Sequence, residues 1–283
     1  MRWKTGRRSS HIEDRRGTRA GGRLAKGGIG TVVIAMGLAY FLGVDPRVVF
    51  QLQESLAPTT TETDYQPTAK GQEQAEFVSV VLADTEDTWS AIFRQSGYNY
   101  EKPNLVLFTG RVNSACGMAS AAMGPFYCPA DKKVYIDLAF FDDLKSRHGA
   151  SGDFAQAYVI AHEIGHHVQN LLGTSSQVNK AQRGLGKSGA NALSVKLELQ
   201  ADCFAGLWGN HADRSRQILE RGDIEEALNA ASAIGDDRLQ KEGKGYVVPE
   251  SFTHGTSKQR VHWFKQGITT GDVGDCDTFG PES

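Results

Sequence analysis

The chain has 283 residues, of which 40% are hydrophobic and 23% are charged. This composition is ordinary for a globular protein and excludes a chain that is disordered throughout, and the length suits one main domain with appendages or two small domains. The formal net charge of −2 hides an asymmetry, because residues 1–26 carry nine Lys or Arg but only two acidic residues. Two differently charged segments indicate two different environments.

An apolar stretch follows this basic segment. Residues 27–44, GGIGTVVIAMGLAYFLGV, include no charged residue across 18 positions. A membrane-spanning helix needs about 20 mainly apolar residues, and the basic flank fits the positive-inside rule. We therefore expect residues 1–26 in the cytoplasm, one uncleaved transmembrane helix at 27–44 in the inner membrane, and the remainder in the periplasm or an equivalent extracytoplasmic space. A cleaved signal peptide is the main alternative, but no clear cleavage site follows.

The four cysteines, Cys116, Cys128, Cys203 and Cys276, all follow the apolar stretch. Four cysteines in an oxidising compartment allow two disulfides, with three possible pairings. A local bridge between Cys116 and Cys128 is the simplest, and Cys203 with Cys276 would then tie the C-terminal tail to the body. Buried free thiols are the alternative, and the lack of a CxxC pair argues against a cysteine zinc site.

The rest of the chain predicts a linker followed by one α+β domain. Residues 45–72 include a stretch rich in Thr, Pro and Gln and read as the linker, and the domain occupies residues 73–283. Apolar periodicity and turn residues predict a mainly helical domain with a small β-sheet. In chain order we expect a helix at 73–97, strands at 104–112 and 133–141, and a helix at 153–173. A flexible excursion at 174–193, with room for a short helical piece, precedes helices at 193–214 and 223–239.

The predicted helix at 153–173 contains the sequence HEIGH. Residues i and i+4 lie one turn apart on one helix face, so His162 and His166 can direct their rings at one Zn²⁺ ion. Glu163 projects at an adjoining angle, from which its carboxylate reaches a water at the metal rather than the metal itself. This is the HExxH arrangement of metalloproteases, and Gly165 permits close approach of another element. A helix with a polar histidine face is the alternative.

A third ligand is expected from a separate element. The sequence LELQAD at 197–202 offers Glu198 on a second predicted helix, 32 residues after His166. Asp202 lies four residues further along the same face, where its carboxylate can accept the outer N–H of a ligating histidine. An exposed Glu/Asp pair would be the better interpretation of this segment alone, but the HExxH motif favours the metal site.

These segments together resemble the bacterial family of neutral zinc metallopeptidases, which are membrane-anchored proteases of the gluzincin type. The resemblance extends over approximately residues 70–280 and includes the basic N-terminus with one apolar span. It implies a zincin-like fold, one Zn²⁺ ion held by His162, His166 and Glu198, and Glu163 as the catalytic acid/base. The matching segments are AHEIGHHVQ, ELQADCFAGLW, THGTSKQRVHWFKQG, GDCDTF and the stretch TGRVNSACGMASAAMGPFYCPADKKVYIDLAFF.

The expected reaction is hydrolysis of a peptide bond by a zinc-activated water, with Glu163 as general acid/base. The developing oxyanion requires a further donor. His254 and Arg260 are the candidates, partly through the resemblance, and Tyr246 is a weaker one. The strand at 133–141 either aligns an extended substrate or is a central core strand. The expected partners are a peptide or protein substrate and the lipid membrane.

The remaining histidines are expected to play no direct part. His167 lies about 100° around the helix from His166 and should point away from the metal. His148, His211 and His262 have no partner at ligand spacing and are expected to be structural or exposed.

Two other functions compete with the peptidase interpretation. A non-catalytic, zinc-stabilised scaffold that binds envelope proteins would need no general base such as Glu163. A nucleic-acid-binding membrane protein could use the basic residues of 1–26, but these are more simply a topology signal that also contacts anionic lipid, so no nucleic-acid partner is expected.

Overall fold

The computed structural model describes residues 1–18 and 65–280. The expected transmembrane helix at 27–44 and most of the expected linker at 45–72 lie outside the described residues. Among the helices that are described, none combines the length and the apolar character that a membrane crossing requires. The described residues Met1–Arg16 and those from Gln66 onward belong to one compact unit.

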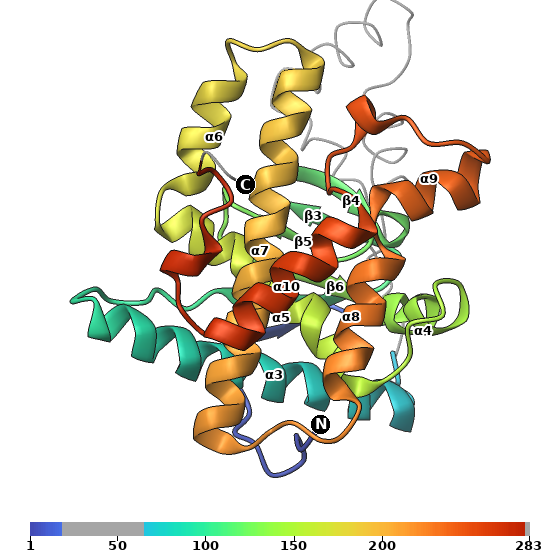
Figure 1. Cartoon of the computed structure of the whole chain (residues 1–283). Helices are drawn as coiled ribbons and strands as arrows, with labels where there is room; N and C mark the ends of the chain where they lie inside the picture. Colours follow the sequence, from blue (N-terminus) through green and yellow to red (C-terminus); the bar gives the residue numbers. More distant parts are fainter. Residues whose placement is uncertain (19–64, 281–283) are drawn as a thin grey trace, which may run out of the picture. The chain divides into compact units, whose positions relative to one another are not determined.

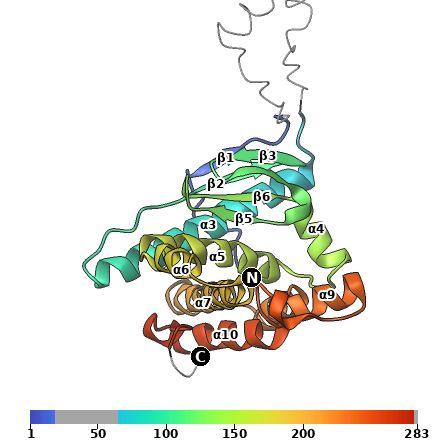
Figure 2. The ribbon, with the colours of Figure 1, turned by 90° about the horizontal axis from the view of Figure 1, so that it is seen from above.

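A four-stranded mixed sheet forms one layer of this unit, in the order β1-β2-β6-β5 (Figure 2). The first three strands are parallel, and β5 is antiparallel to β6. Buried apolar side chains fill β2 and β6, as expected for central strands covered on both faces. A separate two-stranded hairpin is formed by β3 and β4. The strands are β1 (Ile12–Asp14), β2 (Asn104–Phe108), β3 (Arg111–Ser114), β4 (Gly117–Ser120), β5 (Phe126–Cys128) and β6 (Lys133–Asp137).

Eight α-helices occur in the described residues, and the longest of them pack as layers beside the sheet (Figure 1, Figure 2). The helix α5 lies between the sheet and α7, and α10 covers the other side of α7. The helices are α3 (Ala69–Gln95), α4 (Ala139–Ser146), α5 (Asp153–Leu171), α6 (Thr174–Gln182), α7 (Lys187–Arg216), α8 (Asp223–Ala233), α9 (Asp236–Lys244) and α10 (Ser257–Thr270), with short 3₁₀ turns η1 (Ala121–Met123), η2 (Pro249–Ser251) and η3 (Gly274–Cys276).

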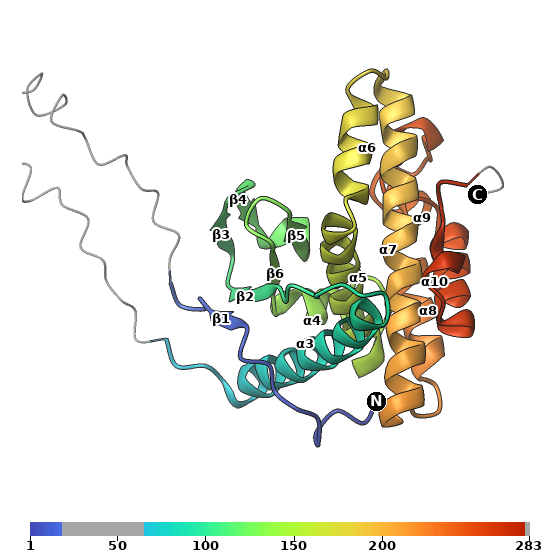
Figure 3. The same cartoon turned by 90° about the vertical axis from the view of Figure 1, so that its left-hand side faces the viewer.

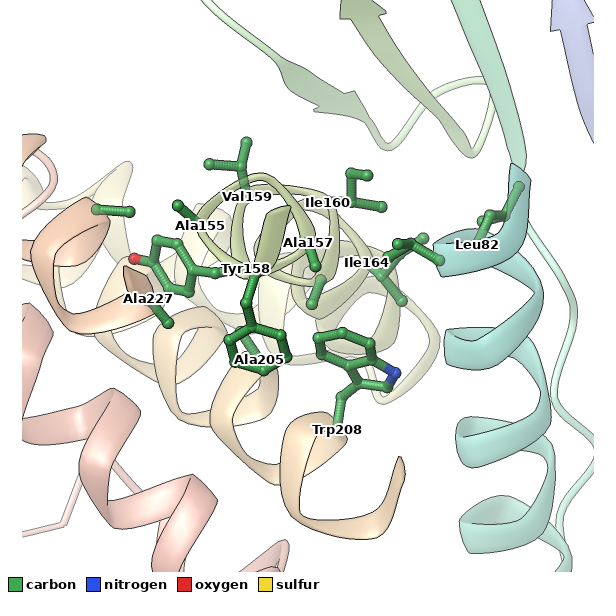
Figure 4. Packing of buried hydrophobic residues seen from close by; sticks show 14 of the residues in the cluster. Leu82, Ala155, Ala157, Tyr158, Val159, Ile160, Ile164, Ala205, Trp208 and Ala227 are labelled. Carbon is green, nitrogen blue, oxygen red and sulfur yellow. The ribbon is translucent and has the colours of Figure 1, made fainter. Parts of the chain in front are cut away.

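The main hydrophobic core lies where α3, α5 and α7 meet. Ile164 of α5 lies beside Trp208 of α7, and Leu82 of α3 lies on the far side of Ile164 (Figure 4). Phe154 of α5 stacks on the Trp208 ring at a centroid distance of 5.8 Å. The Trp208 indole N–H donates to Asp84 at 2.8 Å, so this large side chain is buried without an unpaired donor. Because α5 is buried on several sides, its position relative to α7 is closely defined.

The mainly helical α+β class is confirmed, but several boundaries differ from the sequence pattern. The expected strand at 133–141 ends at Asp137, and α4 begins at Ala139. The excursion at 174–193 holds α6 and the start of α7, and the helix expected at 223–239 breaks at Gly235 into α8 and α9. Finally, α10 was not anticipated, although the Thr256 and Gln259 side chains form a capping box at its start.

The N-terminal segment departs most from the expected organisation. Residues 1–26 were expected as a segment separate from a domain that begins near 73, but residues 1–16 are part of the folded unit. The strand β1 pairs in parallel with β2, so the N-terminal residues complete one edge of the sheet (Figure 3).

Both predicted disulfides are present. One joins Cys116 to Cys128 across 12 residues, and the other joins Cys203 of α7 to Cys276 of η3 across 73 residues. All four cysteines of the chain are therefore paired.

Candidate metal centre

The candidate site forms where α5 crosses α7. Gly165 faces Ala201 at this crossing, and a Cβ atom on Gly165 would lie 3.0 Å from both the Cα and the carbonyl oxygen of Ala201. Glycine is therefore required for the two backbones to approach this closely. The close approach brings Glu198 of α7 opposite the two histidines of the HExxH motif on α5.

Three side chains converge at this crossing with the donor atoms that zinc prefers. His162, His166 and Glu198 each offer one ligand atom, and these atoms all lie within 4.8 Å of one another. The Nε2 atoms of His162 and His166 lie 3.1 and 3.4 Å from the two carboxylate oxygens of Glu198. Two imidazole nitrogens and one carboxylate on two buried helices fit a zinc site that keeps its fourth position open for catalysis.

The outer nitrogen of His162 is held by Asp202. Its Nδ1 atom lies 2.8 Å from the Asp202 carboxylate, which also accepts from the Tyr158 hydroxyl at 2.5 Å. This contact leaves Nε2 of His162 free to face the metal position, and a carboxylate partner increases the basicity of the ligand. Asp202 thus lies where the i+4 spacing from Glu198 places it.

Arg260 is the charge partner of Asp202. Its guanidinium forms a bidentate pair with Asp202 at 2.8 Å for both contacts, and the side chain is only 2% exposed. A further N–H donates to the Tyr158 hydroxyl. These contacts neutralise Asp202. Arg260 also lines the same cavity as Glu163, and its expected role toward an oxyanion stays a prediction.

The outer nitrogen of His166 has a partner that sequence reasoning missed. Gln169 is fully buried, and its Oε1 atom lies 2.9 Å from Nδ1 of His166. The Gln169 amide in turn donates to the Leu197 carbonyl at 2.6 Å and to the Gln200 side chain. Its i+3 spacing from His166 is the signal that could have identified it, because residues three apart share a helix face.

Charges at the site compensate one another in the metal-free protein. Burial alone would lower the pKa of His162, but the carboxylates of Asp202 and Glu198 outweigh burial and raise this pKa to about 10. Burial would raise the pKa of Asp202, but Arg260 and His162 lower it to about 2. Asp202 is therefore ionised, and a protonated His162 lies between the carboxylates of Asp202 and Glu198.

A cavity of about 770 Å³ opens onto these residues, and Glu163 lines it together with the three candidate ligands. The lining also includes Met123 of η1 and Phe126 of β5, both within the segment that the Cys116–Cys128 disulfide encloses. Apolar side chains such as Phe140 of α4 line the same space. This combination of an apolar wall and a few converging polar groups is typical of a substrate site.

His254 also lines this cavity, and Asp236 holds it in place. The backbone N–H groups of Thr253, His254 and Gly255 all donate to one oxygen of the Asp236 carboxylate, at 2.7, 2.6 and 3.1 Å. The other oxygen lies 3.2 Å from Nδ1 of His254. This contact raises the pKa of His254, so its outer nitrogen is more readily protonated.

Three further histidines, His167, His211 and His262, lie away from the candidate ligands. His167 is buried away from the ligands, with its ring nitrogens against the Glu101 carbonyl at 2.6 Å and the Tyr127 hydroxyl at 3.0 Å. His211 contacts the Gly271 carbonyl, and His262 is exposed beside Trp263. All three lie where the sequence places them, as structural or exposed residues.

His148 behaves differently, because it lines the cavity. Its Nδ1 atom is buried and has no hydrogen-bond partner among the described residues. A single histidine before a Gly-rich turn gives no sequence signal for this position. Of the two interpretations of the strand at 133–141, the structure shows the central core strand, because β6 lies inside the sheet and β5 occupies its edge.

Comparison with known families and proteins agrees with this geometry. Residues 1–279 match the family described as "Putative neutral zinc metallopeptidase". The chain is 48% identical to the uncharacterized protein YpfJ of Escherichia coli K12 over 289 residues, covering 99% of each chain. It is 41% identical to the uncharacterized proteins Mb2605 of Mycobacterium bovis and Rv2575 of Mycobacterium tuberculosis H37Rv, covering 85% of each chain. No solved structure matches. The chain belongs to the neutral zinc metallopeptidase family.

Proposed function

We propose that this protein is a zinc-dependent metalloendopeptidase that hydrolyses peptide bonds. One observation carries the proposal: the ligand atoms of His162, His166 and Glu198 converge within 4.8 Å, and Glu163 lines the cavity onto which they open. A purely structural zinc site closes its fourth position with a protein ligand, whereas three ligands beside a carboxylate in a cavity favour catalysis.

Each residue of the site has a defined part in this chemistry. Bound zinc supplies a Lewis acid that polarises the substrate carbonyl and lowers the pKa of water. Glu163 accepts the proton of the attacking water and transfers it to the leaving amine. His254, held by Asp236, donates a hydrogen bond to the oxyanion that develops on the substrate. Asp202 and Gln169 orient the two ligating imidazoles.

The substrate of this proposal is an extended peptide. In the sheet order β1-β2-β6-β5, strand β5 is the terminal strand, and Phe126 and Tyr127 of this strand line the cavity. An extended peptide can add to such an edge through main-chain hydrogen bonds, which select for conformation rather than for one side chain. Unfolded segments of proteins are therefore the proposed substrate class.

The proposed location is the extracytoplasmic face of the cytoplasmic membrane. Two disulfides fit an oxidising compartment, and the apolar stretch at 27–44 is long enough to attach the protein to lipid.

The direct test is the substitution Glu163→Gln, with Glu225→Gln as the matched control because Glu225 is exposed and lies on α8 outside the cavity. We expect Glu163→Gln to lower the rate of cleavage of an unfolded, fluorescently labelled casein by about 10²–10⁴-fold, because it removes the general acid/base. Zinc content, measured by mass spectrometry of the purified proteins, should equal that of the wild type in both variants.

Two outcomes would contradict the proposal in different ways. A wild-type protein that binds no zinc would overturn the metal site itself. If wild type and both variants bind zinc and none cleaves the casein, the site is a zinc-stabilised scaffold rather than an enzyme.

A further inference from the structure

The first 16 residues are integrated into the same sheet as the metallopeptidase domain. Strand β1 pairs in parallel with β2, with Ile12 opposite Leu105 and Asp14 opposite Leu107 (Figure 3). The Leu105 N–H donates to the His11 carbonyl, and the Arg15 N–H donates to the Leu107 carbonyl, both at 2.8 Å. Main-chain pairing of this kind requires the two segments to lie in one compartment.

A buried carboxylate on α3 depends on the same N-terminal residues. Glu86 is fully buried, and its oxygens contact Ser9 at 2.5 Å and both Arg7 and His11 at 2.9 Å. Burial would raise the pKa of Glu86, but these contacts outweigh burial and lower it. Residues 7–11 therefore supply three of the side chains that keep the buried Glu86 carboxylate ionised.

The basic residues of this segment lie near carboxylates, Lys4 at an exposed position and Arg16 in the interior. The sequence pattern presents them as a topology signal, but each one that the structure describes lies within 4.0 Å of a carboxylate. The pairs are Arg2–Glu220, Lys4–Glu73, Arg7–Glu86, Arg8–Glu76, Arg15–Glu13 and Arg16–Asp14. Four of these carboxylates, those of Glu220, Glu73, Glu86 and Glu76, lie beyond residue 66. Positive charge in this segment therefore has a structural explanation that does not require a cytoplasmic location.

These contacts restrict how the chain can be arranged at a membrane. The hydrocarbon core is about 30 Å thick, whereas paired strands lie about 4.8 Å apart. Residues 17–65 join the two parts of the sheet-bearing unit, so any crossing within this stretch must be matched by a return. We infer that residues 1–16 lie on the same side of the membrane as the metallopeptidase domain, and that 27–44 does not separate them as a single-pass span.

The disulfides indicate which side this is. Cys116–Cys128 and Cys203–Cys276 both belong to the unit that contains β1, and disulfides persist in oxidising compartments. The N-terminal residues are therefore assigned to the extracytoplasmic side, opposite to the side that the positive-inside rule predicts. This inference does not depend on peptidase activity, so it can be tested independently of the proposed function.

The first experiment uses the unmodified full-length protein in native membranes. A carbodiimide joins a carboxylate to a neighbouring amine without a spacer, and Glu13 lies 2.5 Å from the Lys133 ammonium. The pair Glu101–Lys132, at 2.6 Å and entirely within the later part of the chain, is the internal control. We expect mass spectrometry of the digested protein to detect both cross-linked peptides. Detection of the control pair alone would overturn the inference.

The second experiment compares the sidedness of two positions directly. The variants Lys4→Cys and Tyr98→Cys each place one free thiol at a highly exposed site, because these side chains are 77% and 70% exposed. Spheroplasts and lysed cells are treated with a membrane-impermeant maleimide. We expect both thiols to react in intact spheroplasts. Reaction of Tyr98→Cys before lysis and of Lys4→Cys only after lysis would show the single-pass arrangement instead.

Discussion

At the scale of single residues, the two ligating histidines are oriented by different kinds of partner. His162 has a carboxylate, Asp202, whose charge is balanced by Arg260. His166 has a neutral amide, Gln169, which in turn donates to the Leu197 carbonyl and the Gln200 side chain of α7. Because Gln169 carries no charge, its replacement tests imidazole orientation without leaving an unpaired ion in the interior.

We expect Gln169→Leu to weaken zinc affinity by about 10–100-fold, as is usual for loss of an outer partner of a metal-bound histidine. Affinity is measured by competition with a chromogenic chelator. Gln182→Leu is the control, since Gln182 bonds Ala190 and Ser194 on the α6–α7 pair and does not line the cavity. Equal zinc affinity in both variants would show that the Gln169 contact does not orient His166.

The raised pKa of His162 leads to a pH dependence of metal binding. In the metal-free protein this pKa is about 10, so at neutral pH the ring carries a proton that zinc must displace from Nε2. The protonated form competes with zinc below that pKa. Zinc affinity should therefore rise with pH by about tenfold per unit for each proton released. Calorimetry in buffers of different ionisation enthalpy counts these protons, and a count of zero would contradict the charge arrangement described for the site.

At the scale of elements, local patterns predicted the parts of the site that share a helix. The i, i+4 spacing of His162 and His166 on α5, and of Glu198 and Asp202 on α7, follows from helical geometry alone. By contrast, β1 has the sequence IED between basic residues and pairs with a strand about 90 residues away. Such pairing depends on long-range contacts, so the local alternation of apolar and polar residues does not predict it.

The polar segment at 174–193 is more helical than the short helical piece that its sequence allows. It has weak amphipathic character and several polar residues, which predict a flexible loop. The structure forms α6 and the first turns of α7 there, packed against each other as an antiparallel pair. Tertiary packing of the two helices overrides the weak local preference, and a single-sequence pattern contains little of that information.

The crossing of α5 and α7 sets the site geometry, so a change in their spacing should affect metal binding. In Gly165→Ala the new Cβ would meet Ala201 at 3.0 Å and push the helices apart. We expect the free energy of unfolding to fall by about 1–3 kcal/mol. Zinc affinity should fall with it, because Glu198 moves away from the histidines.

The matched control for this change is Gly189→Ala in α7. A Cβ there would meet only the Leu185 side chain, at 3.4 Å or more. Alanine favours the helix over glycine, so this variant should be neutral or more stable by about 0.5–1 kcal/mol. Urea unfolding and zinc titration compare the stability and the zinc affinity of the two variants. A Gly165→Ala protein as stable as the control would show that the crossing tolerates a wider spacing.

At the scale of the whole molecule, the two disulfides constrain different things. Cys203–Cys276 closes a loop of 73 residues and fixes the tail against α7, where the Cys276 carbonyl accepts from Gln200. Cys116–Cys128 closes only 12 residues, but the segment it encloses forms a wall of the cavity. Because the entropy removed from the unfolded chain grows with loop length, the longer bridge should stabilise the fold more.

Replacing each pair by alanines separates these effects. By the loop-length relation, loss of Cys203–Cys276 should lower the free energy of unfolding by about 1–2 kcal/mol more than loss of Cys116–Cys128. Loss of Cys116–Cys128 should instead have the larger effect on casein cleavage, because the wall that includes Met123 and Phe126 is no longer held at both ends. Urea unfolding of the two variants ranks the bridges by their effect on stability, and the cleavage assay ranks them by their effect on activity. If the same bridge has the larger effect on both the free energy of unfolding and the cleavage rate, the two disulfides do not have separate roles. The segment between Cys116 and Cys128 then acts only as part of the fold.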